Sequence, residues 1–600
     1  MLFDKASALL LANTNLLQPS RYVTSNFQIS IDHISRFDWE KTTATESLVY
    51  HDCYAGFQCA RLQVPLDWTA EEGADNRTVQ IALIKFPAPV PVTDSRYGGA
   101  VVLNPGGPGG SGVGLGTHTQ TIISAGPDTD DKTEKYFDVI SFDPRGVNNT
   151  TPNFRCFPDA LERMAFEKEH ASYGLPGSSD TAFINLWTSQ RTLADLCSKR
   201  AIKAGIGEHM STTSVARDIV EIFERHGEWR EQEARRLLTS SGNSESDLPD
   251  HLKYQPGKEM VQYWGFSYGT VLGATLADMY PDRVKRAILD GVVDSFDYYK
   301  GTWISVVQDT DKEIAKFAEY CSKGGPKNCA LYHKDGPASI AQRFSAITEN
   351  LLHNPIGVPG TNAYSPDLAT YSDLKRLFAG VAYGPLRRFH GLAQIMAELE
   401  NGNGTALVQG RRAWTTEFVE ISSNKDLRER CQRTGPYSRA CNPLAGLTMD
   451  QQMVQMAVVC SDSEPKTNWH ARPKWPYTGH LNATTAHPIL FIGNTVDNVT
   501  PIGNAYRMSK GFSGSVVLRQ DTEGHASSSG VSLCTARAVR TYFQTGELPE
   551  IDTTCLPDRL PLDGYSEEKE HPLPKGETDE ALWKAVVGVN DPSARMRMFW

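Results

Sequence analysis

The chain has 600 residues, and its 60 Lys and Arg against 71 Asp and Glu give a formal net charge of −11. Hydrophobic residues make up 40% and charged residues 22%, as in ordinary soluble globular proteins, which excludes a disordered or collagen-like chain. No run of roughly 18 apolar residues occurs, so no membrane span is predicted. The acidic balance argues against nucleic acid as a partner.

The 11 cysteines bear on the cellular compartment. They suggest disulfides and therefore an oxidising compartment, although 11 is also an ordinary number for a cytosolic enzyme of this length. No C-x-x-C and no His/Cys cluster with zinc spacing occurs, so neither a metal nor a cofactor is expected. The candidate pairs are Cys53 with Cys59, Cys321 with Cys329, Cys431 with Cys441, Cys534 with Cys555 and Cys156 with Cys197, which leaves Cys460 over.

Two further features concern secretion. The apolar run 6–12 is short and follows Asp4, so it makes a poor signal peptide. We expect a secreted or extracellular protein whose natural start differs from this one, with an intracellular location as the alternative. N-x-S/T sequons, which are compatible with a secreted glycoprotein, occur at Asn76, Asn148, Asn149, Asn403, Asn482 and Asn498.

The order of predicted elements indicates the fold class. A strand is predicted over 79–86, and an amphipathic helix begins near the N-cap signal Ser211. Strands that alternate with helices predict an α/β fold, with a mostly parallel sheet and helices on both faces. The later strands are short apolar runs, each followed by a Gly- or Asp-bearing turn, at 100–103, 137–142, 260–264, 287–289, 489–492 and 516–518.

The alternation also divides the chain. The predicted core comprises 46–294 and 487–555, and the mainly helical stretch 295–486 between them is predicted to be a cap domain. Residues 227–257 are predicted to be a polar insert in an exposed loop, although alternating Arg and Glu in 230–236 favour a solvated helix face. The predicted N-terminal lead-in and C-terminal tail are 1–45 and 556–600.

A nucleophile motif follows the predicted strand 260–264. Residues 265–269 read G-x-S-x-G around Ser267, and a small-residue helical run follows. The motif alone is weak, but this strand–turn–helix context is what a nucleophile elbow requires. An ordinary Gly-rich turn is the alternative reading.

A serine nucleophile needs a base and a carboxylate that orients the base. In α/β-hydrolases the three residues come in the chain order Ser, then acid, then His. His525 and Asp497 each come just after a predicted strand, where such residues belong. Asp290 and Asp294, which follow the strand after the elbow, are the other candidates for the acid. Asp521 and Glu523 also lie close to His525 in sequence.

The oxyanion hole needs backbone N–H groups beside the nucleophile. One is expected from Tyr268, and the other from Gly107 in the glycine-rich loop 104–112, NPGGPGGSG. The same loop contains G-x-G-x-x-G, the dinucleotide-binding pattern. Pro108 lies inside that pattern, and no acidic residue ends a second strand at the required distance, so we do not favour a nucleotide site.

Taken together, NPGGPGGSG, FDPRG, WGFSYGT, LDGVVD and VDNVTP…GH resemble the tripeptidyl/prolyl aminopeptidase-like family of α/β-hydrolases. The resemblance runs from about residue 49 to 555. It implies Ser267 as nucleophile, Asp497 as acid and His525 as base, under a helical cap. It also implies cap carboxylates that bind the substrate amino group, for which Glu398, Glu400 and Glu417 are candidates.

We therefore expect a serine hydrolase that releases short N-terminal units, of tripeptide or proline type, from peptides with a free amino terminus through an acyl-enzyme. An esterase, lactonase or thioesterase acting on small acyl substrates uses the same triad and is the alternative. A catalytically silent binding protein is a third interpretation. Neither a membrane nor a nucleic acid is an expected partner, and the sequence predicts no oligomeric state.

Overall fold

The computed structural model describes residues 37–54, 56–112, 117–126, 133–244, 248–361, 365–416, 449–464, 471–564 and 572–590. Apart from Phe37, they belong to one compact unit, Asp38–Trp600.

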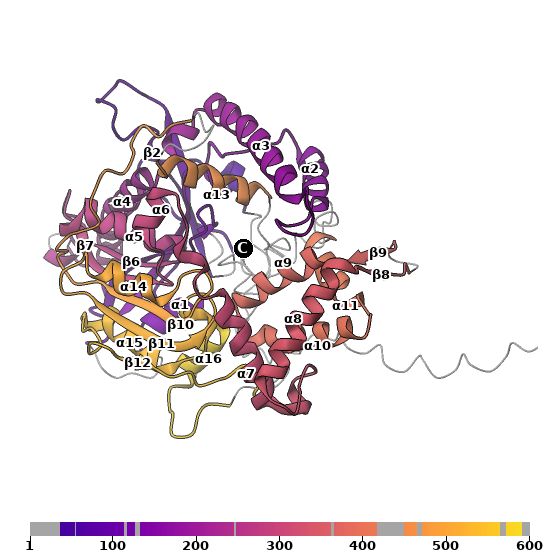
Figure 1. Ribbon diagram of the computed structural model, residues 1–600. Coiled ribbons are helices and arrows are strands. Elements are labelled where there is room, and N and C mark those ends of the chain that lie inside the picture. The colour runs from indigo at the N-terminus through magenta and orange to yellow at the C-terminus, as the bar shows by residue number, and fades with distance from the viewer. Residues whose placement is uncertain are drawn as a thin grey trace, which may run out of the picture. The chain divides into compact units, whose positions relative to one another are not determined.

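A ten-stranded sheet forms the centre of this unit, in the order β1-β2-β3-β5-β4-β6-β7-β10-β11-β12 (Figure 1). The pairs from β1 to β5 are antiparallel, and every pair from β5 to β12 is parallel. The parallel part confirms the predicted α/β-hydrolase fold. The strands are β1 (His51–Asp52), β2 (Gln58–Pro65), β3 (Thr78–Phe86), β4 (Tyr97–Asn104), β5 (Tyr136–Asp143), β6 (Val261–Phe266), β7 (Val284–Asp290), β10 (Leu490–Val496), β11 (Val516–Glu523) and β12 (Thr554–Cys555).

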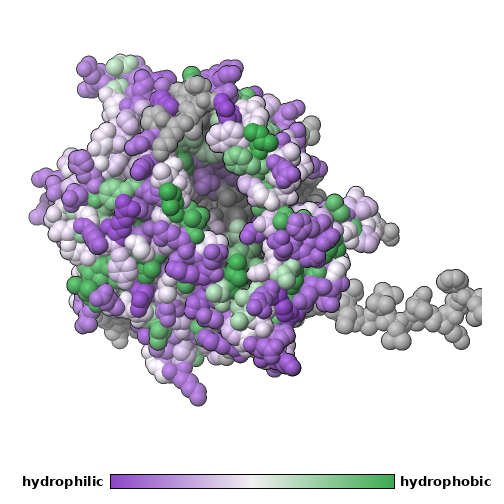
Figure 2. Space-filling model, in the orientation of Figure 1, coloured by the Kyte–Doolittle hydropathy of each residue, from purple (hydrophilic) through white to green (hydrophobic). Residues whose placement is uncertain are grey.

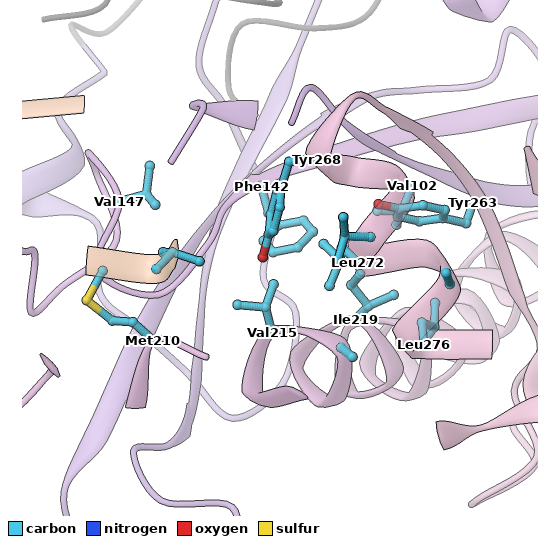
Figure 3. Close-up of a cluster of buried hydrophobic side chains, with 14 of the residues drawn as sticks. Val102, Phe142, Val147, Met210, Val215, Ile219, Tyr263, Tyr268, Leu272 and Leu276 are labelled. Atoms are coloured by element: carbon cyan, nitrogen blue, oxygen red, sulfur yellow. The ribbon is translucent and has the colours of Figure 1, made fainter. Parts of the chain in front are cut away.

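Alternate residues of the central strands face two separate cores. On one face, α4 (Thr212–Ser240), α5 (Tyr268–Met279) and α14 (Ile502–Ser509) cover residues such as Val102 and Tyr263. Figure 3 shows Leu272 and Leu276 of α5 beside Ile219 of α4. On the other face, α1 (Thr117–Ile123), α15 (Leu533–Thr545) and α16 (Glu580–Val589) cover the neighbouring residues, such as Trp264. Burial on both faces explains why these strands read as apolar runs.

The chain between β7 and β10 is mainly helical. Helices α7 to α11 and a small hairpin enclose a third hydrophobic core of their own around Phe317 and Phe389. Helix α13 belongs elsewhere, because Met453 and Ala457 pack into the core of the main sheet. The elements are α6 (Ser295–Lys300), α7 (Thr310–Asn328), α8 (Pro337–His353), β8 (Ile356–Val358), β9 (Asp367–Ala369), α9 (Tyr371–Ala382), α10 (Pro385–Glu400), α11 (Thr405–Thr416) and α13 (Met449–Asp462).

Two expectations about the first half of the chain were wrong. Strands β1 and β2 precede 79–86, which was expected to be the first strand. Strand β2 lacks a clear apolar pattern because it buries Arg61, whose guanidinium donates to Gln80, Thr151 and the Asn149 carbonyl.

The insert predicted at 227–257 does not begin as a loop. Helix α4 continues unbroken to Ser240, so the first half of this segment is helical. Ion pairs one turn apart, such as Arg235 with Glu231, support the exposed side. Ala234 packs on the other side with Val92, Leu248 and Leu252 in a small core. Two long further helices, α2 (Ala160–Ser172) and α3 (Ala182–Ala204), precede α4.

Four of the candidate cysteine pairs are disulfides. They are Cys53–Cys59, Cys156–Cys197, Cys321–Cys329 and Cys534–Cys555. Cys460 takes no part in these four disulfides, and the pair Cys431 and Cys441 lies outside the described residues. None of the described helices is both long and apolar enough to cross a bilayer.

Candidate active site

Ser267 occupies a sharp turn between β6 and α5. Its backbone has φ 56° and ψ −124°, a conformation that costs a non-glycine residue energy and is typical of a nucleophile elbow. The flanking glycines are required by close approaches. A Cβ on Gly265 would lie 2.4 Å from the Gly269 carbonyl oxygen, and one on Gly269 would lie 2.8 Å from the Asn104 carbonyl oxygen.

His525 and Asp497 lie together just beyond the ends of β11 and β10. Nδ1 of His525 is 3.1 Å from each carboxylate oxygen of Asp497, and both side chains are fully buried. Asp497 also accepts hydrogen bonds from Val499 N, Thr500 N, Thr500 Oγ1 and Ala526 N, at 2.7 to 2.9 Å. The Thr500 hydroxyl is in addition 3.0 Å from His525 Nδ1.

These contacts set the charge of Asp497. Burial alone would raise the pKa of its carboxyl, but the charge of His525 and the hydrogen bonds from His525 and Thr500 outweigh burial and lower it. Asp497 is therefore ionised at neutral pH. An anion beside Nδ1 favours the tautomer with its proton there, which leaves Nε2 able to act as a base.

The other candidate acids have different partners. Asp290 accepts hydrogen bonds from Ser527 and Trp264, and Asp294 caps α6 and forms an ion pair with Arg507. Asp521 accepts a hydrogen bond from Thr495, and Glu523 accepts one from Tyr320. Asp497 is the carboxylate that the structure places against His525.

The glycine-rich loop lies against the elbow. A Cβ on Gly106 would be 2.9 Å from the Cβ of Ser267 and 3.0 Å from the backbone nitrogen of Tyr268. The N–H of Gly106 donates to Asn104 Oδ1, so it is already engaged. The next N–H along the loop belongs to Gly107, the residue predicted as the second oxyanion donor. Tyr268 opens α5, where a backbone N–H has no partner within the helix.

A buried polar cluster beneath Tyr268 was not predicted. The hydroxyls of Tyr268 and Thr212 are 2.5 Å apart, and Asp462 of α13 accepts from Thr212 N, Thr212 Oγ1 and Tyr298 OH. Burial raises the pKa of Asp462 to about 6, although the hydrogen bonds from Thr212 and Tyr298 oppose that rise. The N-cap signal at the start of α4 marked this place, but Asp462 rather than the Ser211 side chain binds Thr212 N.

The cap reaches the same loops from the other side. Asp309 Oδ2 lies 3.4 Å from Asp497 N, and Glu313 Oε1 accepts a hydrogen bond from Gly524 N. The Tyr383 carbonyl accepts from His525 N, and the two rings meet edge to face. Burial and the charges of Glu523 and Asp497 raise the pKa of Glu313 well above its ordinary value.

Two of the three cap acids proposed from the resemblance have other partners. Glu398 accepts a hydrogen bond from Asn403, and Glu400 pairs with Arg343, both at the surface end of α10. Glu417 lies outside the described residues. Figure 2 shows a hollow on one face of the molecule, among α3, α13 and α9. Within the described parts of the chain, no group of three or more His, Cys, Asp or Glu could hold a metal ion.

Comparison with known proteins bears on what this arrangement does. Residues 447–555, which carry Asp497 and His525, match the family model described as "TAP-like protein". The predicted family resemblance is confirmed. The tripeptidyl aminopeptidase of Streptomyces lividans is 25% identical over 547 residues, which is 87% of each chain.

Two mycobacterial proteins show the range of related activities. The serine protease Hip1 of Mycobacterium tuberculosis is 28% identical over 59% of this chain and 58% of its own. Carboxylesterase B of the same species is 25% identical over 83% of this chain and 86% of its own. These similarities support a hydrolase of the α/β superfamily with peptidase-type relatives.

Proposed function

We propose that this protein is a serine hydrolase that removes short N-terminal units, of tripeptide or proline type, from peptides with a free amino terminus. The observations that carry the proposal are the buried Asp497–His525 pair and the turn at Ser267, which are linked because Asp290 accepts hydrogen bonds from both Ser267 N and Ser527 of the histidine loop. The similarity to a tripeptidyl aminopeptidase over most of the chain supports the peptide substrate.

In this mechanism Ser267 Oγ attacks the scissile carbonyl while His525 Nε2 accepts its proton. Asp497 holds the imidazole through Nδ1 and stabilises the imidazolium that forms. The N–H groups of Tyr268 and Gly107 stabilise the oxyanion of the tetrahedral intermediate. His525 then donates its proton to the leaving amine, and water activated by His525 hydrolyses the acyl-enzyme.

The cap supplies a candidate for recognition of the amino group. Glu313 on α7 is fully buried, and its Oε2 has no hydrogen-bond partner among the described residues. A substrate ammonium group would satisfy that oxygen and favour its ionised form. We expect Glu313→Gln to raise KM for free-amino peptides about tenfold and to leave ester hydrolysis within about twofold.

The decisive experiment compares wild type and Ser267→Ala on three substrates. These are a proline-containing tripeptide anilide with a free amino group, its N-acetylated counterpart and a short-chain p-nitrophenyl ester. We expect hydrolysis of the free-amino anilide, loss of that hydrolysis in Ser267→Ala, and no cleavage of the acetylated compound. Equal rates for the two proteins would contradict the role of Ser267.

An esterase is the second candidate, because a carboxylesterase is among the relatives that span most of the chain. The same triad serves esters, so the assay above separates the two. Ester hydrolysis that is lost in Ser267→Ala, without cleavage of either anilide, would assign the protein to this class.

We further propose that the protein works in an oxidising compartment. The four disulfides in the described residues support this. Asn76, Asn403 and Asn482 are exposed sequons that could carry glycans. Expression in a secretory host, followed by endoglycosidase digestion and a gel-mobility assay, tests both points.

A further inference from the structure

The C-terminal end of β7 touches all three loops that carry the predicted triad. It consists of Asp290, which ends the strand, and Gly291. The Asp290 carbonyl oxygen accepts the backbone N–H of Ser267 at 3.0 Å. The nucleophile is thus fixed by the main chain of a residue whose side chain points to a different loop.

The Asp290 carboxylate holds the histidine loop. Oδ1 accepts Ser527 N at 2.8 Å, and Oδ2 accepts Ser527 Oγ at 2.5 Å and Trp264 Nε1 at 3.3 Å. Ser527 lies two residues after His525, and the Asp290 side chain is fully buried. Three donors converging on one carboxylate leave this part of the histidine loop little freedom.

Gly291 connects β7 to the third loop, which carries Asp497. Its N–H donates to the Ile492 carbonyl of β10, the strand that leads to Asp497. A Cβ at this position would lie 2.8 Å from Ala526 Cβ and 3.2 Å from Thr500 Oγ1, and its φ is +67°. The loops of His525 and Asp497 therefore approach β7 more closely than a side chain here would permit.

We propose that Asp290 is a positioning residue that fixes His525 relative to Ser267 for proton transfer. It touches no reacting atom, and it acts through Ser527 on one side and through its own carbonyl on the other. This inference rests on the proposed serine-hydrolase chemistry, and it does not depend on whether the substrate is a peptide or an ester.

Burying the charged Asp290 carboxylate costs free energy that an apolar side chain at this position would not cost. Burial raises the pKa of Asp290 to about 6, although hydrogen bonds from Ser527 and Trp264 and the charge of His525 oppose the rise. A buried anion of this kind is weak evidence for stability but can specify geometry. Proton transfer depends steeply on geometry, because a displacement of about 1 Å can cost about 100-fold in rate.

The test compares Asp290→Asn with Asp294→Asn in the full chain. Asp294 is a matched control, since it is a buried aspartate shortly after the end of the same strand. It caps α6 and pairs with Arg507 of α14, and among the described residues its hydrogen bonds and ion pair reach none of the three triad loops. Asparagine also caps helices well. At Asp290, an amide NH₂ would face donors on Ser527 or Trp264, so the histidine loop must shift.

For p-nitrophenyl ester hydrolysis, we expect Asp290→Asn to lower kcat by about 10- to 100-fold with KM within about threefold. Asp294→Asn should stay within about twofold of wild type. Fluorophosphonate titration carried to completion counts the sites with a reactive serine, so that kcat is expressed per active centre. An equal kcat per site in Asp290→Asn and wild type would overturn the inference, because the loss would then reflect folding alone.

Ser527→Ala provides a milder second variant. It removes one donor to Asp290 and keeps the backbone N–H, so we expect kcat to fall about threefold to tenfold. If Asp290 acts through Ser527, the double variant should resemble Asp290→Asn rather than show the product of the two losses. Multiplicative losses would contradict the coupling. An inert wild type would instead overturn the proposed function, and the two failures are therefore distinguishable.

Discussion

Thr500 is the residue that contacts both the acid and the base of the predicted triad. Its hydroxyl donates to Asp497 Oδ2 at 2.7 Å and lies 3.0 Å from His525 Nδ1. Thr500→Val keeps the shape and removes one of the bonds that hold the buried carboxylate, so we expect kcat/KM to fall about tenfold, or ~1.4 kcal/mol. Thr500→Ser, which keeps the hydroxyl, should recover most activity, and equal losses in the two variants would contradict the role of the hydrogen bond.

At the scale of single residues, the sequence predicted the site residues that follow strands. It missed the residues whose role comes from contacts with residues far away in the sequence. Ser267, Asp497 and His525 each follow a predicted strand within a few residues, so chain order and position pointed to them. Asp290 was considered only as an alternative acid, and its contact with Ser527 joins residues that are 237 positions apart. No local pattern encodes such a pair, and the same holds for Thr212 with Asp462.

At the scale of elements, Arg145 joins the loop after β5 to α4. Its guanidinium binds both oxygens of Asp218 at 2.7 Å, and neither side chain is exposed. It also donates to the carbonyls of Leu66, Pro65 and His209. The FDPRG motif therefore supplies a buried connection between a loop of the sheet and the long helix that covers it.

This connection predicts an asymmetric response to mutation. Asp218→Leu leaves the Arg145 charge buried without its anion, so we expect the free energy of unfolding to fall by about 3–5 kcal/mol. The double variant Arg145→Met/Asp218→Leu removes both charges and should recover a large part of that loss. Urea unfolding measures both, and a double variant that is no more stable than Asp218→Leu would contradict the explanation that the unpaired Arg145 charge causes the loss.

The elements themselves were predicted to different degrees. The seven predicted strands all occur, because strands buried on both faces form apolar runs that stand out from their surroundings. Strand β2 was missed because Arg61 interrupts its pattern. The second half of α4 was included in the predicted loop with the polar stretch 240–246 that follows it, although its alternating Arg and Glu favoured a helix face. A polar composition shows only that a segment is exposed to solvent. Whether this segment is a helix depends on its ion pairs and on the burial of Ala234.

The whole molecule combines two differently built parts at its candidate active site. The sheet carries Ser267, Asp497 and His525, while the cap helix α7 brings Asp309 and Glu313 against the loops of the acid and the base. Several carboxylates are buried together where the parts meet. Burying these carboxylates in their charged form costs free energy, and this makes the stability of the whole molecule depend on pH.

Burial raises the pKa of Asp290 and Asp462 to about 6, and burial with neighbouring charges raises that of Glu313 well above its ordinary value. In the unfolded chain these groups titrate near 4, so between about pH 4 and 6 the native state binds more protons. Their contribution to the free energy of unfolding therefore falls as the pH rises through this window. Asp497 acts oppositely, but its pKa lies below 3.8, so its contribution is lost only in stronger acid.

The buried histidines oppose the carboxylates, because burial lowers the pKa of His209 and His226, so below about pH 6.5 the unfolded chain binds more protons at these two side chains. The contribution of a carboxylate is therefore measured by difference, from the melting temperatures of wild type and a variant near pH 5 and near pH 7.5, by calorimetry at constant ionic strength. The matched variant is Asp462→Asn, which removes one of the titrating groups far from the predicted triad residues in sequence. The melting temperature near pH 5 minus that near pH 7.5 should be smaller in this variant than in the wild type. An unchanged difference would show that Asp462 does not titrate as its burial requires.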